Sequence, residues 1–194
     1  MRVEIRSDSV EVSGYVNATG RDSQPLADHE GYFVERVEPG TFARALERNR
    51  NVPMLLNHDP GRVLATPGSG LELREDAVGL YARAVVTDPE VVDEARRGRL
   101  RGWSFGFRAL RQSDGERGGL RHRTLREIEL REVSLLDDSR VPAYPATSVF
   151  TRDDGEEMEV RTMQDLVETS EEAPPAPDLS PWTDVVRELE QRAL

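Results

Sequence analysis

Residues 102–107 read Gly102-Trp103-Ser104-Phe105-Gly106-Phe107, and this alternation of large and small side chains predicts a β-strand with two unlike faces. The three aromatic residues share one face, which suits a protein core. Ser104 lies on the opposite face between two glycines, whose small size leaves room for the backbone of a substrate to approach. Glycines beside a strand serine also allow close packing inside a sheet. Ser104 taken alone therefore fits a nucleophile and a structural residue equally well.

A histidine earlier in the chain is a candidate partner for this serine. His58 follows the short apolar run 52–56, where a predicted strand leads into Asp59-Pro60-Gly61, and a side chain at a strand end can reach a cleft. A lone histidine is more often a surface or capping residue. His29 and His122 have polar or charged neighbours, so both are expected to be solvated, and His122 is kept as a secondary candidate.

Glu132 is an acid within an otherwise apolar strand pattern. Period-two alternation predicts that Leu130, Glu132 and Ser134 share one face of a strand over 120–136. A carboxylate in that row is costly to bury unless it has a cationic or hydrogen-bonding partner. The imidazole of His58 is one such partner, and a structural ion pair with an arginine is the alternative. His58, Ser104 and Glu132 supply a general base, a nucleophile and an orienting acid for acyl transfer.

The composition excludes several other kinds of site. The chain has no cysteine, which rules out disulfides and thiolate metal ligands, and it has no lysine, which rules out a Ser–Lys dyad. The three histidines lack a second ligand at metal-binding spacing, so neither a metal nor a cofactor is expected. Gly102-x-Ser104-x-Gly106 also matches the nucleophile elbow of α/β-hydrolases. That elbow needs a helix directly after the serine, whereas residues 105–110 predict a strand.

The rest of the pattern predicts a β-rich α+β fold. One helix is expected from Pro39-Gly40-Thr41 to about residue 50, and another from an N-cap at Asp88 to Gly98. No strand–helix–strand rhythm repeats, which favours a small antiparallel or mixed β-barrel with peripheral helices over a parallel doubly wound sheet. Strands are expected at 10–18, 32–37, 52–56, 100–110 and 120–136, with a hairpin over 71–86.

Charge divides the chain into two parts. The net charge is -11, and residues 151–194 hold 13 acids and 4 arginines, so residues 1–150 are nearly neutral. We therefore predict a folded domain over 1–150 and a flexible, acidic, proline-containing tail over 151–194, with a short amphipathic helix as one option at 182–194. Nothing resembles a phosphate-binding surface, a signal peptide or a membrane span, so a cytoplasmic protein without nucleic-acid or membrane partners is expected.

Several segments together resemble the capsid maturation (prohead) serine proteases of tailed bacteriophages, which are related to the herpesvirus assemblin proteases. They occur in the order of that family and span most of residues 10–149. The segments are 38–42, 55–59, 79–82, 98–107, 130–136 and 142–146.

The resemblance implies that Ser104 is the nucleophile and His58 the general base. Assemblins use a second histidine as the third member, whereas the phage branch uses an acid, which Glu132 fits by position; His122 is the other candidate. It also implies a small β-barrel wrapped by helices, with His58 and Ser104 on neighbouring strands. Backbone N–H groups near Arg140 and Val141 are the candidates for receiving the oxyanion.

The expected partners are the major capsid protein and a scaffold segment, cleaved inside the assembling procapsid in the host cytoplasm. Trimming of the protein's own tail is a further expectation, and because assemblins dimerise, so is a homodimer. The alternative function is a catalytically inert capsid assembly factor built on the same fold. An inert scaffold would tolerate Ser104→Ala without any loss of processing, which distinguishes the two.

Overall fold

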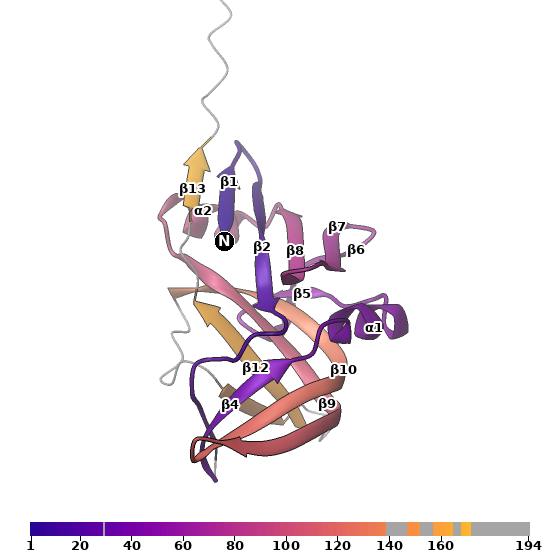
Figure 1. Ribbon diagram of the computed structural model, residues 1–194. Helices are drawn as coiled ribbons and strands as arrows, with labels where there is room; N and C mark the ends of the chain where they lie inside the picture. Colours follow the sequence, from indigo (N-terminus) through magenta and orange to yellow (C-terminus); the bar gives the residue numbers. More distant parts are fainter. Residues whose placement is uncertain (29, 139–146, 152–156, 165–167, 172–194) are drawn as a thin grey trace, which may run out of the picture.

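The computed structural model describes residues 1–28, 30–138, 147–151, 157–164 and 168–171 (Figure 1). Strands dominate and form a mixed sheet in the order β11-β12-β9-β10-β5-β6-β7-β8-β2-β1-β13, with β4 on β10 and β3 on β4. The strands are β1 (Arg2–Ile5), β2 (Val10–Ala18), β3 (Leu26–Asp28), β4 (Gly31–Val37), β5 (Met54–Leu56), β6 (Asp59–Pro67), β7 (Gly70–Glu75), β8 (Gly79–Val86), β9 (Leu100–Arg117), β10 (Leu120–Asp137), β11 (Thr147–Thr151), β12 (Glu157–Gln164) and β13 (Glu168–Glu171). The helices are α1 (Thr41–Arg48) and α2 (Pro89–Arg96).

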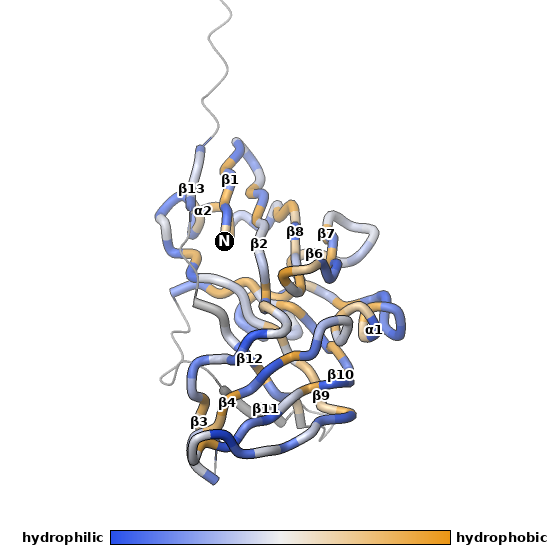
Figure 2. Tube along the Cα trace, in the orientation of Figure 1, coloured by the Kyte–Doolittle hydropathy of each residue, from blue (hydrophilic) through white to orange (hydrophobic). Residues whose placement is uncertain are grey.

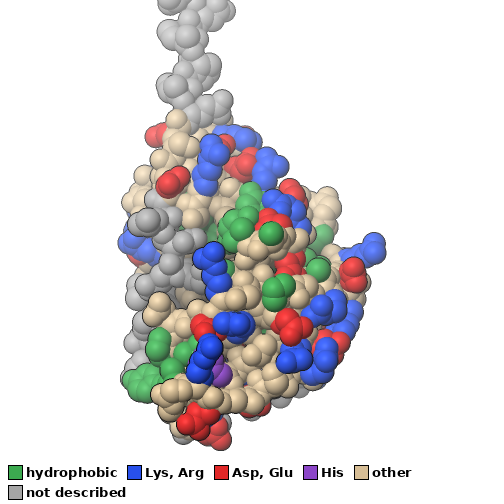
Figure 3. Space-filling model, in the orientation of Figure 1, with side chains coloured by type: hydrophobic (Ala, Val, Ile, Leu, Met, Phe, Trp, Pro, Cys, Tyr) green, Lys and Arg blue, Asp and Glu red, His purple; other side chains and the backbone are tan. Residues whose placement is uncertain are grey.

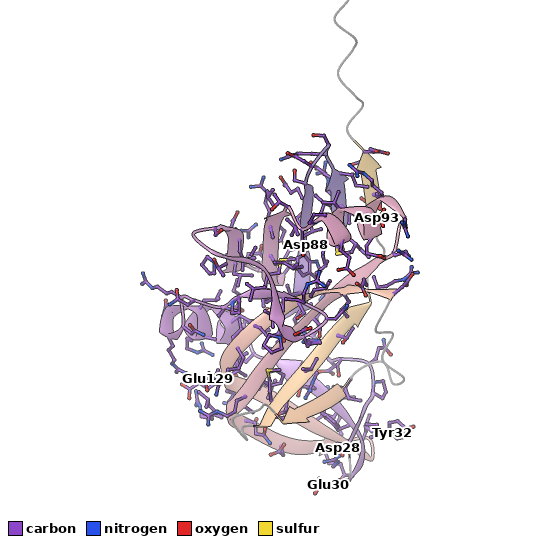
Figure 4. All side chains as sticks on the ribbon, turned by 180° about the vertical axis from the view of Figure 1, so that it is seen from behind. Asp28, Glu30, Tyr32, Asp88, Asp93 and Glu129 are labelled. Atoms are coloured by element: carbon purple, nitrogen blue, oxygen red, sulfur yellow. The ribbon has the colours of Figure 1, made fainter. Side chains whose placement is uncertain are left out.

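Local sequence signals predicted the helices and the early hairpin correctly. Asp88, labelled in Figure 4, caps α2: its carboxylate accepts hydrogen bonds from the N–H groups of Glu90 (3.0 Å) and Val91 (3.2 Å). The hairpin expected over 71–86 is β7 and β8, which pair antiparallel. Neither helix in the described residues is long and apolar enough to cross a membrane.

The strand that carries Ser104 lies at the centre of the core. The side chains of Trp103, Phe105 and Phe107 are fully buried, and the ring of Phe105 lies 5.3 Å from those of both Phe42 on α1 and Phe107. The aromatic face predicted for residues 102–107 is therefore confirmed. Figure 2 shows stretches of hydrophobic and hydrophilic residues succeeding one another along β4 and β10.

A register shift in β10 changes the face on which Glu132 lies. Leu130 is paired with Phe107, but Glu132 is paired with Gly106, so one extra residue, Arg131, is inserted between them. Such a bulge reverses the alternation of side chains beyond it. The prediction that Leu130 and Glu132 share a face is therefore wrong: Leu130 lies on the aromatic face, whereas Glu132 and Ser134 lie on the face of Ser104.

The sheet branches at β10 and does not close into a barrel. One edge of β10 pairs with β9, while the other pairs with β4 over residues 121–125 and with β5 over 133–135. Within the described residues no ladder joins β11 to β13, the two ends of the strand order. α1 packs against β10 and β7, and α2 against β1 and β2, so helices surrounding a closed barrel are not observed. The β-rich, mixed character of the prediction is confirmed, but its closed barrel is not.

Two strands lie within the segment predicted to be a flexible tail. β12 pairs antiparallel with β9 across residues 102–107, and β13 pairs parallel with β1. The folded part of the chain therefore continues beyond residue 150. The short helix suggested for 182–194 lies outside the described residues.

Buried ion pairs fasten β12 to β4 and β10. The guanidinium of Arg161 donates to both carboxylate oxygens of Glu35, at 2.7 and 2.8 Å, and to Glu159 at 2.7 Å. Arg123 on β10 contacts Glu159 through two further hydrogen bonds of 2.6 and 2.7 Å. On the outer surface, arginine and acidic side chains lie side by side over the face shown in Figure 3. The charges of β12 that resemble a solvated tail are thus neutralised inside the fold.

Acid should weaken this attachment of β12. Burial by itself would raise the pKa of Glu159, but hydrogen bonds and charges from Arg123 and Arg161 outweigh it and hold that pKa below its ordinary value of 4.5. The ionised carboxylate therefore stabilises the fold fully above pH 4.5, and this stabilisation is lost as the pH falls through the lowered pKa. Urea unfolding of wild type and Glu159→Gln should differ most at neutral pH and converge in acid. Parallel stability curves would contradict this.

Candidate active site

His58 is presented by a tight turn between β5 and β6. Leu56 pairs with Asp59, so Asn57 and His58 form a two-residue hairpin loop, and their φ angles of 52° and 62° are those of a type I′ turn. Few non-glycine residues adopt this left-handed conformation, although asparagine and histidine do so more often than most. Backbone strain of about 1–3 kcal/mol persists only where surrounding contacts hold it. The conformation of His58 is therefore held by its neighbours.

Asn57 supplies most of that support. Its side-chain amide donates to Asp137 Oδ1 (2.9 Å) and its amide oxygen accepts from the Asp137 N–H (3.1 Å), while its own N–H donates to the carbonyl of Leu135 (2.9 Å). Three hydrogen bonds thus tie the turn to the end of β10. A buried asparagine bonded in this way fixes the direction in which the next residue points.

The imidazole of His58 meets Glu132 directly. His58 Nδ1 lies 2.7 Å from Glu132 Oε1, and the two side chains are only 12% and 4% exposed. Ser134 completes the arrangement, because its hydroxyl donates to Glu132 Oε2 (2.6 Å) and accepts from the backbone N–H of His58 (3.2 Å). Both carboxylate oxygens therefore have partners, and the histidine is held at its ring and at its backbone.

Gly106 makes the space for this carboxylate. A Cβ atom at Gly106 would lie 2.5 Å from Glu132 Oε1 and 2.5 Å from the sulfur of Met158. Any side chain there would push Glu132 out of its contact with His58. The small residue beside Ser104 thus accommodates the acid, a use that the pattern of residues 102–107 did not reveal.

Ser104 lies on the same face, but its hydroxyl contacts β12. It pairs in register with Ser134, next to the pair Gly106–Glu132. Its Oγ donates to the carbonyl of Arg161 (2.8 Å) and lies 3.3 Å from Thr162 Oγ1, and the residue is fully buried. Within the described part of the chain, the imidazole of His58 is not among its hydrogen-bond partners. The space above Gly106, which was expected to admit a substrate, holds the side chains of Glu132 and Met158, and β12 pairs along the edge of β9.

The structure thus joins two of the three predicted residues and brings the third to the same face. His122 does not belong here: it lies ten residues before Glu132 on β10, about 30 Å along the strand at 3.3 Å per residue. Its neighbour Arg121 binds Asp28 and Glu30, which Figure 4 shows at the far end of the molecule. His122 therefore lies outside the cluster that His58, Glu132 and Ser134 form. Arg140 and Val141 lie outside the described residues.

Two residues of the site were not predicted from the sequence. Ser134 was placed in a predicted strand but was given no role, because no sequence pattern distinguishes a serine that binds a catalytic acid from any other serine in a strand. Asn57 gave a weak signal, because type I′ turns usually pair asparagine with glycine.

The arrangement fits a proton acceptor held by an acid. If Nδ1–H of His58 donates to Glu132, Nε2 is left with a lone pair, and the carboxylate stabilises the imidazolium that forms when Nε2 takes a proton. The hydroxyl of Ser104 lies on the same face, where it is bonded to β12.

Comparison with known proteins identifies the family of the chain. The model of the family described as Caudovirus prohead serine protease matches residues 1–161, which include His58, Ser104, Glu132 and most of β12. No curated protein and no solved structure matches the chain. Because the family match spans most of the sequence, the chain belongs to the Caudovirus prohead serine protease family.

Proposed function

We propose that this protein is a serine endopeptidase that cleaves the capsid protein or a scaffold segment during procapsid maturation in the host cytoplasm, and that it also trims its own acidic tail. The observation that carries the proposal is the 2.7 Å contact between Glu132 Oε1 and His58 Nδ1 on the face that bears Ser104. Membership of the prohead protease family supports the class of substrate.

In the proposed reaction, His58 Nε2 removes the proton of Ser104 as Oγ attacks a peptide carbonyl, and then returns it to the leaving amine. Glu132 keeps Nδ1 protonated and stabilises the imidazolium. Water then takes the place of the amine: His58 Nε2 removes a proton from the water as its oxygen attacks the acyl carbon, and the proton returns to Ser104 Oγ as the acyl group leaves. Ser104 must first exchange its hydrogen bond to Arg161 for one to His58.

The test is co-expression with the capsid partner, followed by intact-mass measurement of both proteins. Wild type should yield shortened capsid protein and a shortened protease, and Ser104→Ala should yield neither. The ends of the products would identify the bonds that are cut. Full-length masses in both samples, with shells assembled, would refute the endopeptidase proposal.

A second candidate function is an inert assembly factor on the same fold. The observation that favours it is the complete burial of Ser104 and its hydrogen bond to β12 rather than to His58. However, a scaffold has no need for a buried carboxylate bonded to an imidazole, which is costly to bury. In the co-expression experiment, an inert factor would support shell assembly equally well with Ser104→Ala.

Ser134 should act as a positioning residue. Removing its hydroxyl deletes a hydrogen bond to a charged group, worth about 1.5–3 kcal/mol, so Ser134→Ala should lower kcat roughly 10–100-fold. KM should stay near its wild-type value, because Ser134 holds Glu132 rather than substrate. Ser134→Thr, which keeps the hydroxyl, should restore part of the rate.

Ser113→Ala is the matched control for Ser134, because Ser113 lies on the same β9–β10 hairpin, paired with Thr124 far from Glu132. It should leave kcat unchanged. Equal losses in both variants would mean that Ser134 acts only through the stability of the hairpin.

A further inference from the structure

The outer edge of β9 beside Ser104 is occupied by the protein's own strand. β10 pairs with one edge of β9, and β12 pairs antiparallel with the other, so that Thr162 is opposite Ser104 and Val160 opposite Gly106. Extended peptides commonly bind proteins by adding a strand to a sheet edge, with main-chain hydrogen bonds giving affinity and side-chain pockets giving specificity. β12 therefore lies where such a peptide would bind.

The hydroxyl of Ser104 is bonded to the backbone of β12. Its Oγ donates to the carbonyl oxygen of Arg161 at 2.8 Å, so a peptide group of β12 lies against this serine. Because Ser104 is fully buried, no second peptide can reach it while β12 is in place.

An acidic subsite holds the arginine of this strand. Residues 161 and 162 point to opposite faces, and the Arg161 side chain binds Glu35 on β4, with its guanidinium 5.1 Å from the centre of the Phe107 ring. Its other partner, Glu159, belongs to β12 itself and is not part of the subsite. Glu35 binds it through both oxygens and is 5% exposed, and Arg161 is 6% exposed. Bidentate pairing to a buried carboxylate selects arginine over other side chains.

We infer that the outer edge of β9 is the peptide-binding site of this enzyme, with β12 as its resident occupant, and that a substrate binds as an extended strand with an arginine in the Glu35 subsite. The inference rests on the proposed function. Substrate then binds only those molecules in which β12 has left the edge of β9. The apparent affinity for substrate equals the intrinsic affinity multiplied by the fraction of such molecules. Because the family match runs to residue 161, most of β12 is part of the family domain itself.

Arg161→Met tests the inference in the full-length chain. Breaking one side of a buried ion pair is strongly destabilising, so release of β12 should become at least about 100-fold more frequent. Hydrogen exchange should accelerate in residues 157–164 and in residues 102–107 of β9, while β2 stays protected. Labelling of Ser104 by a fluorophosphonate, read as a mass shift that is absent in Ser104→Ala, should accelerate in parallel.

Arg83→Met is the matched control, because Arg83 forms a bidentate pair with Glu11 that joins β8 to β2 and includes no residue of β9 or β12. It should change neither readout at β9. If Arg161→Met fails to fold, Glu35→Gln removes the same charge contact while keeping the size of the side chain, and the same exchange and labelling results are expected.

A peptide in trans tests the subsite. In Arg161→Met, the peptide Glu-Met-Glu-Val-Arg-Thr-Met-Gln should slow exchange of residues 102–107, and its version with methionine in place of arginine should not. Equal protection by both peptides would overturn the arginine subsite.

Rapid labelling of Ser104 in wild type while residues 157–164 stay protected would overturn the inference and leave the proposed function standing. If the peptide protects residues 102–107 but Ser104 is never labelled, the proposed function is overturned and the peptide-binding site stands.

Discussion

Ser104→Ala should reduce the rate of peptide cleavage by roughly 10⁶-fold, an effect that only a substitution of His58 is expected to equal. The hydroxyl of Ser104 is the atom that forms the acyl-enzyme, and no other described hydroxyl occupies its position. Ser134 lies opposite it in register, but its proton is committed to Glu132 and its lone pair to the N–H of His58. A neighbouring serine therefore cannot take over the reaction.

The same loss should follow His58→Ala, and the double variant should lose no more than either single variant. Residues of a catalytic triad act as a unit, so removing one leaves little for the other to contribute. The measurement is the rate of appearance of shortened capsid protein, with the melting temperature of each variant as a control for folding. If the losses multiplied, Ser104 and His58 would be acting in separate steps, and the triad would be wrong.

Much of the fold could be predicted because it depends on neighbouring residues. The faces of residues 102–107, the Asp88 cap and the hairpin over 71–86 each follow from local alternation or spacing. The failures arise where distant segments decide the outcome. The sheet stays open because β4 and β5 both pair with the same edge of β10. The local sequence of these strands does not indicate that they pair in this way.

The contact between His58 and Glu132 could be predicted from the sequence, but the supporting roles of Ser134 and Asn57 and the surroundings of Ser104 could not. His58 and Glu132 meet as the sequence suggested, although Glu132 reaches the face of Ser104 only because Arg131 is inserted in the register. β12 resembled an acidic linker because its partners, Glu35 and Arg123, lie 126 and 36 residues away along the chain from the charges they neutralise. An acidic segment can be read as solvent-exposed only where no distant part of the chain supplies arginines or acids that pair with its charges.

Glu132→Gln should reduce cleavage about 10⁴-fold by imposing the wrong tautomer on His58. The amide must present its oxygen to one neighbour and its NH₂ group to the other. Ser134 already accepts from the N–H of His58 and has a proton to donate, so it takes the oxygen, and the NH₂ group faces Nδ1. Nδ1 must then accept, which places the proton on Nε2 and leaves no base for Ser104.

A second substitution, at Ser134, should restore part of the activity that Glu132→Gln removes. In the double variant Glu132→Gln/Ser134→Ala, nothing fixes the amide, so its oxygen is free to face Nδ1–H and return the lone pair to Nε2. The double variant should therefore cleave faster than Glu132→Gln alone, although Ser134→Ala by itself slows the enzyme. Steady-state rates of the four proteins make up the double-mutant cycle. A double variant slower than Glu132→Gln would mean that Ser134 does not orient the side chain at position 132.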